Sequence, residues 1–576
     1  MKSSLENIID LWGHFSLKNK ILFCVTTFSS IISAIFETQV LVTFIPLISK
    51  LTSIDSSSNA DISLRYNFIF RNLYSENTST SKVLFIFSFL VVTSALIRLL
   101  FLYLASINAA SIGSQLSKLC FKSIIYRPYI NLIAEDTGEI IEMILGNIAR
   151  TIKVIMSCSV IISSSLLTLA IIFSLLLVDV KITLIIFSVL LSSYLILYRL
   201  AKLKLYNNGK VVFSSSTSII SLGKESIYSI KEIIIKNLYS KYINKFEKID
   251  VKLRRKQASS QFIALYPRYI LEAISILLLT NIAYSMGKNE VNLSILPKLG
   301  FFSLGFIRLL PAIQQIYSRL SNIRTFLSSI EALNSVLVSK KEFKKIEIEN
   351  TEIKFPPINK NIEKIIRAEN ISFKYPKGQN EAITNLSLTF EKGKHYAIVG
   401  KSGCGKSTLI DLLLGILTPT KGNIYFYDIN IKQPQFRNFY YTKIAYVPQT
   451  PIILNESIKN NIILDSDSFF DEEYLYKVIK SVNLENFVQK NGINFFCGED
   501  GINLSGGQRQ RIAIARALYA NKAILFIDEC CSALDSATEN DVMNAIFTNF
   551  KNKTIISVTH NINQIEKYDE IIRLEE

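Results

Sequence analysis

The stretch Gly400-Lys401-Ser402-Gly403-Cys404-Gly405-Lys406-Ser407 decides the fold of the second half of this chain. Its glycines allow successive backbone N–H groups to face phosphate oxygens, and the helix expected after it adds the positive end of its dipole. Lys406 supplies a point charge, Ser407 a hydroxyl for Mg²⁺, and Thr408 extends the set of expected nucleotide contacts. The pattern therefore predicts a strand, a phosphate-binding loop and a helix in that order.

Two more motifs follow downstream. The first is Leu504-Ser505-Gly506-Gly507-Gln508. The second is the apolar run Ala523-Ile524-Leu525-Phe526-Ile527, which predicts a buried strand that delivers Asp528 to the metal and is followed by Glu529. Each pattern recurs by chance when it stands alone, but the three in this order predict an enzyme that binds and hydrolyses ATP.

Two side chains are candidates for the chemistry of hydrolysis. Glu529 should face the γ-phosphate, where a carboxylate can orient and polarise the attacking water, so it is the candidate general base. His560 ends the apolar run Ile555-Ile556-Ser557-Val558-Thr559 and is expected to be a second positioning group near the γ-phosphate. The alternative for His560 is a histidine that only satisfies the end of a strand.

With these motifs the chain resembles the ATP-binding cassette (ABC) family, and in particular its exporter-type half-transporters, over essentially its whole length. The resemblance implies an α-helical polytopic membrane domain with six transmembrane helices, followed by an α/β P-loop ATPase domain. It also implies that Tyr375 stacks on adenine and that Gln449 contacts Mg²⁺ and senses the membrane domain. ATP and Mg²⁺ are the implied cofactors.

The resemblance further implies a functional dimer. In this family the signature, residues 504–508, closes over the ATP that the Walker A loop, residues 400–407, holds in another copy. Ser505, Gly506, Gly507 and Gln508 are therefore expected to touch that ATP. A homodimer is the simplest closed arrangement, and a heterodimer with a second half-transporter is the alternative.

Three other stretches match or depart from the family pattern. Ser532-Ala533-Leu534-Asp535 resembles the loop that couples the two ATP sites, and Cys497-Gly498-Glu499-Asp500-Gly501 resembles the exporter loop that touches the partner's cytoplasmic helices. The family usually has an aliphatic residue in place of Cys497 and small or hydroxyl residues in place of Cys530 and Cys531. Neither departure removes a reacting group, so we expect hydrolysis to be retained.

Composition places the first half of the chain in a membrane. The 576 residues are 49% hydrophobic, which is high for a soluble protein of this length. Six segments are long enough to cross a bilayer core of about 30 Å at about 1.5 Å per residue; they are about 21–48, 83–107, 154–178, 182–200, 264–286 and 294–318. A buried helix is the alternative for any one of them. We expect a transmembrane domain over 1–325, a linker over 326–364 and the ATPase domain over 365–576.

Lysine and arginine set the expected orientation. They are dense between the fourth and fifth spans, from Arg199 to Lys256, and sparse around Lys181 and Lys288. By the positive-inside rule the dense loop, both termini and the ATPase domain are expected to be cytoplasmic. The resemblance implies that the membrane is a bacterial inner membrane. Short coupling helices are implied near 127–139 and 236–241. The net charge of +17 then needs no nucleic acid to explain it, and no nucleic-acid-reading module is present.

The seven cysteines do not suit a disulfide framework or a zinc site, because they fall in expected membrane or cytoplasmic segments and lack paired spacing. A redox switch at Cys404, Cys530 and Cys531 is one hypothesis for the cysteines near the nucleotide. Inert packing of small side chains is the other.

Ionisable residues inside the spans are the candidates for the cargo site, because a charge in a bilayer is costly unless it is paired or wet. They are Glu37, Arg98, Arg268, Glu272 and Arg308. Arg268 with Glu272, and Glu37 with Arg98, are each placed to form purely structural pairs. Alternatively, the arginines line a cavity and bind a diphosphate headgroup, whose oxygens suit guanidinium.

The short motifs around these residues resemble bacterial flippases for lipid-linked oligosaccharides. They are Phe36-Glu37-Thr38, Pro267-Arg268-Tyr269-Ile270-Leu271-Glu272 and Arg308-Leu309-Leu310-Pro311. The loop from Lys50 to Lys82, with Ile62, Leu64, Tyr66, Phe68, Ile69, Phe70, Leu73 and Tyr74 beside Arg65 and Arg71, resembles that group's external amphipathic helix, which would hold a polyprenyl tail. A folded cap without a ligand role is the alternative for this loop.

Three interpretations follow for the whole chain. The first is an ATP-driven flippase or exporter of a polyprenyl-diphosphate oligosaccharide that works by alternating access. The second keeps the transporter and changes the cargo to another lipid, a peptide or a hydrophobic drug. The third is an ATP-gated channel or regulator. Such proteins can function without hydrolysing ATP, so the presence of Glu529 and His560, both candidates for hydrolysis, argues against it.

Overall fold

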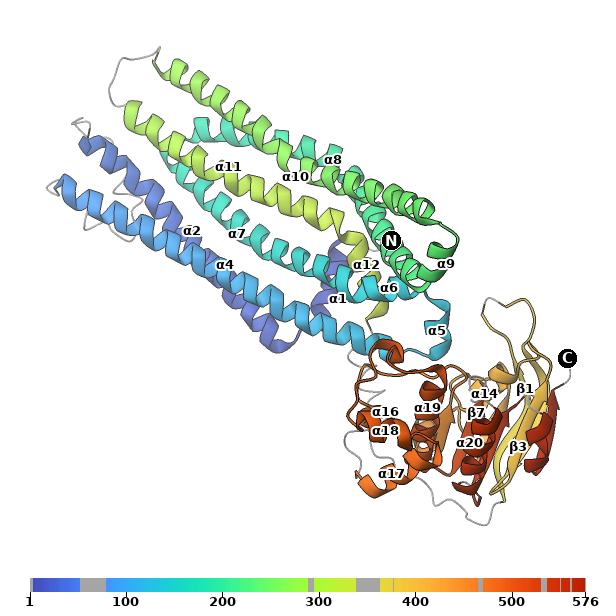
Figure 1. Ribbon diagram of the computed structural model, residues 1–576. Coiled ribbons are helices and arrows are strands. Elements are labelled where there is room, and N and C mark those ends of the chain that lie inside the picture. The colour runs from blue at the N-terminus through green and yellow to red at the C-terminus, as the bar shows by residue number, and fades with distance from the viewer. Residues whose placement is uncertain are drawn as a thin grey trace. The chain divides into compact units, whose positions relative to one another are not determined.

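The computed structural model describes residues 4–51, 79–287, 295–337, 363–376, 378–464, 470–529, 536–549, 551–559 and 562–574. By internal contacts the chain divides into two compact units. The first comprises Met1–Arg127 and Ala134–Lys340, and the second comprises Pro128–Ile133 and Lys341–Glu576. Each unit is described by itself (Figure 1).

The described part of the first unit is helical. Its elements are α1 (Ser4–His14), α2 (Leu17–Leu51), α4 (Thr80–Ile125), α6 (Thr137–Glu142), the π-helix η2 (Met143–Asn147), α7 (Ile148–Val178), α8 (Val180–Tyr228), α9 (Ile230–Ile235), α10 (Tyr239–Gly287), α11 (Ile295–Thr325) and α12 (Leu327–Val336). Figure 1 shows the long helices running side by side.

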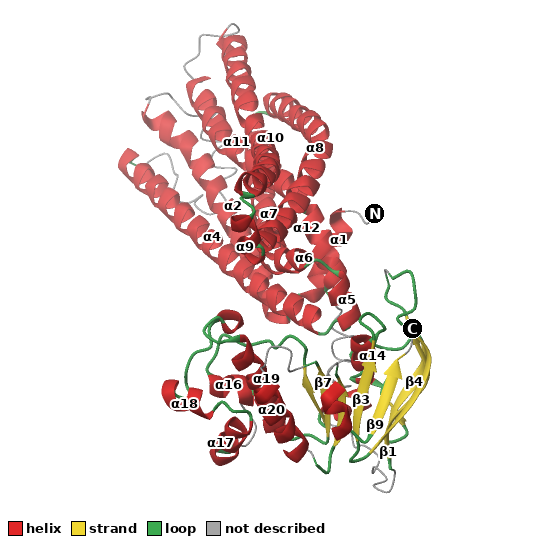
Figure 2. Ribbon diagram, turned by 45° about the vertical axis from the view of Figure 1, so that its right-hand side comes forward, coloured by secondary structure: helices red, strands yellow, loops and turns green. Residues whose placement is uncertain are grey.

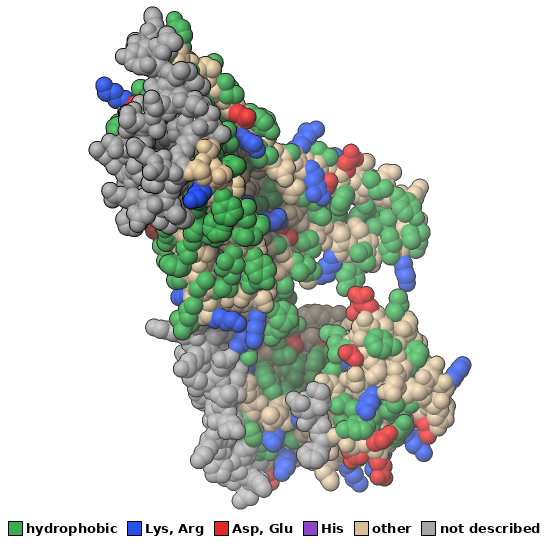
Figure 3. Space-filling model, turned by 90° about the vertical axis from the view of Figure 1, so that its left-hand side faces the viewer, with side chains coloured by type: hydrophobic (Ala, Val, Ile, Leu, Met, Phe, Trp, Pro, Cys, Tyr) green, Lys and Arg blue, Asp and Glu red, His purple; other side chains and the backbone are tan. Residues whose placement is uncertain are grey.

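Six helices among the described residues are long and apolar enough to cross a membrane. They span Leu17–Phe44, Thr80–Ile125, Thr137–Val178, Val180–Tyr228, Tyr239–Tyr284 and Leu299–Thr325. Only 17% to 39% of their most apolar windows is buried inside the chain, so most of this apolar surface faces outward. Figure 3 shows hydrophobic side chains gathered over the long helices on the face that it presents. Such a surface suits lipid rather than water.

The long helices pack in pairs: α2 lies along α4, α7 along α11, and α8 along α10. Asp179 separates α7 from α8, and its Oδ1 accepts a hydrogen bond from Ile182 N at 3.1 Å, which caps the start of α8. Within α8, Gly209 lies against α11, because a Cβ added there would clash with the carbonyl oxygen of Thr325.

The structure differs from the expected linker in its first part. Residues 327–336 form α12, whose side chains Leu327, Ile330 and Leu333 are buried against the first unit. A helix with a buried apolar face is part of a domain rather than a spacer, and this face was not recognised in the sequence. Residues 338–362 lie outside the described part.

Two short helices lie at or beside the expected coupling positions. α5 (Tyr129–Ala134) falls within the expected stretch 127–139, and α9 ends one residue before the expected stretch 236–241. Pro128–Ile133, which includes most of α5, groups with the second unit, where Ile130 packs against a core cluster.

The second unit holds two sheets. Their strands are β1 (Lys364–Phe373), β2 (Ile383–Glu391), β3 (His395–Gly400), β4 (Lys421–Phe426), β5 (Ile429–Asn430), β6 (Ile444–Val447), β7 (Ile524–Asp528), β8 (Thr554–Val558) and β9 (Glu570–Leu574). One sheet is antiparallel in the order β2-β1-β4-β5, and the other is parallel in the order β6-β7-β8-β3-β9. β7 and β8 are buried at every position, as expected for apolar runs in a parallel sheet.

The helices of this unit lie between the strands in the sequence. They are α14 (Lys406–Leu413), α15 (Pro434–Tyr441), α16 (Ile458–Ile463), α17 (Glu472–Ser481), α18 (Glu485–Asn491), the 3₁₀ turn η3 (Glu499–Gly501), α19 (Gly506–Ala520), α20 (Ser536–Asn549) and the 3₁₀ turn η4 (Ile562–Lys567). Figure 2 shows the strands gathered on one side of the unit and α16, α17 and α18 on the other.

Two core clusters correspond to these two sides. One surrounds α14 and the antiparallel sheet and includes Tyr396, Leu409 and Phe426. The other packs α16, α17 and α19 against the parallel sheet and includes Ile458, Leu475 and Ile512. The Walker A loop borders the first cluster and the signature borders the second, so the two motifs belong to different packing regions.

Candidate nucleotide site

The Walker A loop joins β3 to α14, as the sequence predicts. Gly405 caps α14 with φ +92°, and a Cβ there would lie 2.5 Å from the carbonyl oxygen of Ala382, so the position accepts only glycine. Gly403 also has a left-handed backbone, with φ +88°. Within the loop Cys404 N donates to the carbonyl of Lys401 at 3.4 Å. These turns aim backbone N–H groups inward at the start of a helix, which is the geometry of an anion site.

Lys406 is 6% exposed, and its Nζ donates to the carbonyl oxygens of Gly400 and Lys401, each at 2.9 Å. The ammonium group is thus held inside the loop by the loop's own backbone. Ser402, exposed at the turn between Lys401 and Gly403, completes the ring of residues that the sequence assigns to phosphate.

The residues at the end of β7 fit a divalent cation. Asp528 is 5% exposed and its Oδ1 is buried without a hydrogen-bond partner in the described part of the chain, while Ser407 donates a hydrogen bond to the carboxylate. Burial, and then the negative charge of Glu529, raise the pKa of Asp528. An unpartnered buried carboxylate oxygen beside a hydroxyl is a ligand set suited to Mg²⁺, which prefers oxygen.

Glu529 follows directly and has a left-handed backbone, with φ +47°. This conformation is uncommon for a residue with a long side chain and is typical of functional sites. Gln449, exposed after β6, donates from Nε2 to Glu529 Oε2 at 3.0 Å. The two residues therefore meet at adjacent strand ends, and in this structure Gln449 binds the candidate base rather than the metal ligand Asp528.

Tyr375 is held beside the first turn of α14. Its hydroxyl lies 3.2 Å from Thr408 Oγ1, and its ring packs edge-on against Phe373 with centroids 4.9 Å apart. The ring is partly exposed, which leaves room for a second aromatic surface.

The signature forms the start of α19 as a capping box. Ser505 Oγ accepts from Gln508 N at 3.2 Å, and Gln508 Oε1 accepts from Ser505 N at 2.8 Å. Gly506 and Gly507 are the first residues of the helix, so their N–H groups lie at its positive end. Across the described residues, no hydrogen bond joins the signature to the Walker A loop of the same chain.

Several predicted positions lie outside the described residues. They are His560, Cys530, Cys531, Ser532-Ala533-Leu534-Asp535 and the loop side chains from Ile62 to Tyr74. The departure at Cys497 is described: its side chain is fully buried in the helical core, where a thiol replaces an aliphatic group at little cost.

Sequence reasoning missed Asp411, an acid on α14 within the apolar run Leu409–Leu414. Burial, and then the charge of Asp528, raise the pKa of Asp411 to about 6. Tyr129 on α5 is close enough for burial and the charge of Asp411 to raise its pKa as well. A single carboxylate among leucines directly after a phosphate loop was the available signal.

The predicted cargo residues separate into two groups. Glu37 on α2 has a side chain that is 4% exposed and pairs with Arg98 of α4 and Arg308 of α11, each at 3.4 Å. Arg268 and Glu272, both exposed on α10, form no ion pair with each other in the described structure.

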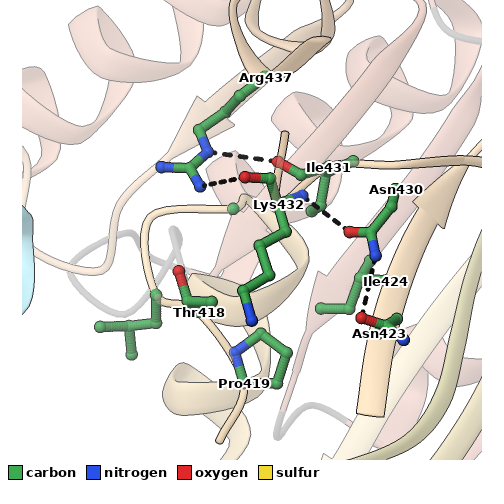
Figure 4. Close-up of a pocket in the computed structure, with 10 residues that line it drawn as sticks. Thr418, Pro419, Asn423, Ile424, Asn430, Ile431, Lys432 and Arg437 are labelled. Atoms are coloured by element: carbon green, nitrogen blue, oxygen red, sulfur yellow. Dashed lines mark hydrogen bonds between the residues drawn. The ribbon is translucent and has the colours of Figure 1, made fainter. Parts of the chain in front are cut away.

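A small pocket elsewhere in the second unit is not a competing nucleotide site (Figure 4). Arg437 closes it by donating to the carbonyls of Ile431 and Lys432, each at 3.3 Å, and Asn430 donates to Asn423 at 2.9 Å. Its volume of about 10 Å³ holds about one water molecule. The pocket is too small for a nucleotide and is a packing feature of the fold.

Comparisons with known proteins agree with this geometry. Residues 383–532 match the family model of the ABC transporter. An export ATP-binding/permease protein of Rickettsia prowazekii is 43% identical over 213 residues, and the match covers 36% of each chain. An ATP-dependent lipid A-core flippase of Pasteurella multocida is 36% identical over 217 residues, with 37% of each chain covered. The chain thus matches only about a third of the length of these curated relatives.

A solved bacterial Atm1-family ABC exporter with ATP bound has the same fold over 96% of both chains, with a TM-score of 0.72 and 18% sequence identity. This likeness extends over the helical unit as well as the second unit. It confirms the predicted fold class of a six-helix membrane domain ahead of a P-loop ATPase domain. Residues 383–532 of the second unit thus match the ABC transporter family, and the chain carries them behind a helical domain with the fold of an ABC exporter.

Proposed function

We propose that this chain is the subunit of an ATP-driven exporter that moves a lipid-linked oligosaccharide across a bacterial inner membrane. Two parts of this proposal rest on different observations. The strand-end cluster of Lys406, Asp528, Glu529 and Gln449 supports hydrolysis of ATP. The carboxylate of Glu37, shared by two arginines inside the membrane helices, supports an anionic lipid as cargo.

In the ATPase domain each residue has a proposed role. The Walker A backbone and Lys406 bind the phosphates, and the ring of Tyr375 stacks on adenine. Asp528 and Ser407 would hold Mg²⁺, whose charge would offset that of the phosphates. Glu529 orients the attacking water and accepts its proton. Gln449 donates to Glu529 Oε2 and so helps to orient the carboxylate, which has further acceptor sites for the water.

The cargo proposal follows from charge balance in the helical unit. Glu37 neutralises one of its two arginine partners, so the group of three carries one net positive charge. The side chains of Arg98 and Arg308 remain 43% and 36% exposed, which leaves N–H donors available to a ligand. A diphosphate supplies both the negative charge and the paired oxygens that guanidinium binds well.

The relatives support a lipid more broadly. The Pasteurella multocida relative is named as a lipid A-core flippase, and lipid A is also an anionic glycolipid. Another lipid, a peptide or a hydrophobic drug is the second candidate for the cargo, because the match to the named flippase covers only 37% of each chain. Channel or regulator activity without turnover is disfavoured by the complete strand-end cluster.

We propose a homodimer as the working assembly, with the ATPase domains in the cytoplasm. Within one described chain the signature and the Walker A loop are not joined, so a second copy is needed to bring them together. Apolar side chains at the α8–α9 tip, including Ile227, Ile230 and Ile235, are 48% to 78% exposed. A cavity of about 480 Å³ beside Gln449 and Gly506 could accept such a tip from the second copy.

The deciding experiment uses purified chain in proteoliposomes with a fluorescent polyprenyl-diphosphate oligosaccharide. Wild type should remove the fluorophore from the accessible leaflet in the presence of ATP and Mg²⁺. Glu529→Gln should not, although it binds ATP. Hydrolysis by wild type without movement of the probe would support the ATPase and overturn this cargo.

Paired variants separate cargo binding from hydrolysis. Arg98→Gln and Arg308→Gln should keep basal ATPase activity and lower the rate of probe movement about tenfold, since a charge-assisted bidentate contact contributes about 1.5–3 kcal/mol. Lys202→Gln removes a cation from exposed α8 surface and serves as the matched control. Equal transport by all three variants would contradict a diphosphate contact at these arginines.

A further inference from the structure

A partly buried guanidinium lies in the helical part of the ATPase domain. Arg516 on α19 donates from Nε to the carbonyl of Asn461 at 2.8 Å and from Nη2 to the carbonyl of Ile452 at 3.1 Å. Nη2 also reaches Asn461 Oδ1 at 3.3 Å. In the described part of the chain Arg516 has no ion pair, and burial lowers its pKa. A partly buried cation without a counter-ion is stabilised by the oxygens that it contacts, which here are two backbone carbonyls and the amide oxygen of Asn461.

Asn461 extends the same network from α16. Its side chain is fully buried, and its Oδ1 accepts from Leu454 N at 2.8 Å while its Nδ2 donates to the carbonyl of Leu454 at 2.9 Å. Nδ2 also donates to the carbonyl of Ser457 at 3.1 Å. One amide therefore satisfies both backbone groups of Leu454 and fixes the chain between Ile452 and Ser457. We name Arg516 and Asn461 together the Arg516–Asn461 node.

The node joins three segments that are distant in sequence. The first begins directly after Gln449, which donates to Glu529. The second is the loop before the signature, where Cys497 N donates to the carbonyl of Glu456 at 2.9 Å. The third is α19, whose first residues are the signature. The node thus connects the loop that follows Gln449, whose side chain contacts the candidate base, to α19, the helix that presents the signature.

We propose that Arg516 is a positioning residue for ATP hydrolysis, which with Asn461 makes the Gln449 loop and the signature helix move as one body. This inference rests on the proposed ATPase function. If the two segments move together, the contact between Gln449 and Glu529 changes when the signature arrives at the ATP of the second copy. Hydrolysis is then confined to the closed dimer.

The node lies away from the groups that bind ATP within one chain. The Walker A helix and Tyr375 pack in the other core cluster. Loss of the node should therefore change turnover and leave the affinity of the Walker A loop for ATP almost unchanged. A residue that only stabilised the fold would alter both quantities together with the unfolding temperature.

The test compares Arg516→Met, Arg516→Lys and the control Arg437→Met in the full-length dimer in nanodiscs. Arg437 is also partly buried and donates to two backbone carbonyls, those of Ile431 and Lys432, but it contacts neither the Gln449 loop nor the signature helix in the described structure. We expect Arg516→Met to lower kcat about tenfold while the dissociation constant of a fluorescent ATP analogue stays within about twofold. Arg516→Lys, which keeps the charge but loses the fork of donors, should lie between Arg516→Met and wild type. Arg437→Met should resemble wild type in both quantities.

Each possible outcome either supports or overturns the positioning role of Arg516. An unchanged kcat in both Arg516 variants, or a parallel loss of kcat, ATP affinity and thermal stability, overturns the positioning role. If Arg516→Met fails to fold, Arg516→Lys decides: a lowered kcat with wild-type affinity and unfolding temperature supports the role, and a wild-type kcat overturns it. A wild-type dimer without ATPase activity would overturn the proposed function, and this inference would fall with it.

Discussion

At the scale of single residues, the nucleotide site combines buried charged groups with an uncommon backbone conformation. Lys406 Nζ donates to two loop carbonyls, the buried Oδ1 of Asp528 has no hydrogen-bond partner among the described residues, and Glu529 has a left-handed backbone. Natural structures leave few such groups without a purpose. They indicate a site built to bind a charged ligand rather than to stabilise the domain.

Glu529→Gln should abolish steady-state hydrolysis while ATP binding persists. A general base typically contributes a factor of about 10²–10⁴, so turnover should fall at least about a hundredfold. The amide is nearly isosteric and can still bond to Gln449, which keeps the local geometry. Phosphate release measures turnover and a fluorescent nucleotide measures binding. Near-normal turnover in the variant would remove Glu529 from the role of base.

Tyr375→Ala should raise the KM for ATP about tenfold and leave kcat nearly unchanged, because an aromatic contact of about 1.5 kcal/mol acts on binding rather than on chemistry. Tyr375→Phe is the matched control, since it keeps the ring and loses only the hydroxyl that faces Thr408. Equal KM values for wild type and Tyr375→Ala would mean that another group holds the adenine.

Asp411→Asn should stabilise the ATPase domain at pH 8, in the absence of Mg²⁺ and nucleotide. The pKa of Asp411 is raised from 3.8 to about 6, so the folded domain prefers the protonated form. The stabilising effect of that proton is present below pH 3.8 and is lost as the pH rises through about 6. Since each pKa unit corresponds to about 1.4 kcal/mol, the variant should gain about 2–3 kcal/mol at pH 8.

The measurement is calorimetric unfolding of both proteins between pH 4 and pH 8. The advantage of Asp411→Asn should shrink as the pH falls. A constant difference at all pH values would show that the carboxylate is not destabilised in the folded domain.

At the scale of secondary-structure elements, close approach of helices depends on single small residues. Gly209 allows α8 to meet the carbonyl of Thr325 on α11, whereas Gly223 on the same helix has no atom within 4 Å of an added Cβ. The two glycines therefore have different structural roles, although the sequence presents both as glycines in one long helix.

Gly209→Ala should destabilise the helical unit by about 1–3 kcal/mol, because α8 and α11 must separate to admit the methyl group. Gly223→Ala is the matched control and should be neutral or stabilising, since alanine favours a helix over glycine by about 1 kcal/mol. Thermal unfolding in detergent, followed by helical circular dichroism, compares the two. Equal unfolding temperatures would contradict the close contact at Gly209.

At the scale of the whole molecule, the proposed dimer has two ATP sites, each with the Walker A loop of one chain and the signature of the other. Mixed dimers test this arrangement. Lys406→Ala disables a Walker A loop, and Gly506→Asp places a negative charge where the signature should approach phosphate. Each variant alone should trap no nucleotide with vanadate.

Dimers that contain one chain of each kind should trap nucleotide at one site, because one Walker A loop and one signature remain intact on facing chains. Tandem affinity purification with two different tags isolates the mixed dimers, and wild-type dimers purified in the same way provide the reference. Mixed dimers without trapping would contradict the shared sites. Trapping by either variant alone would mean that one chain suffices.

Local patterns determined much of this protein. The glycine spacing of the Walker A loop, the apolar run before Asp528 and the six long apolar segments each follow from chain geometry and burial over a few consecutive residues. For that reason the strand–loop–helix order at the Walker A loop and the positions of the long helices were predictable.

Only the tertiary structure decided which distant residues meet. Glu37 pairs with Arg98, 61 residues away, and also with Arg308, 271 residues away. Arg516 finds the carbonyl of Ile452 across 64 residues, and α12 packs as a helix where a linker was expected. A local pattern determines which residues form a helix or strand and which of its faces is apolar. The partner that covers that face, or that neutralises a buried charge, depends on how the elements pack together.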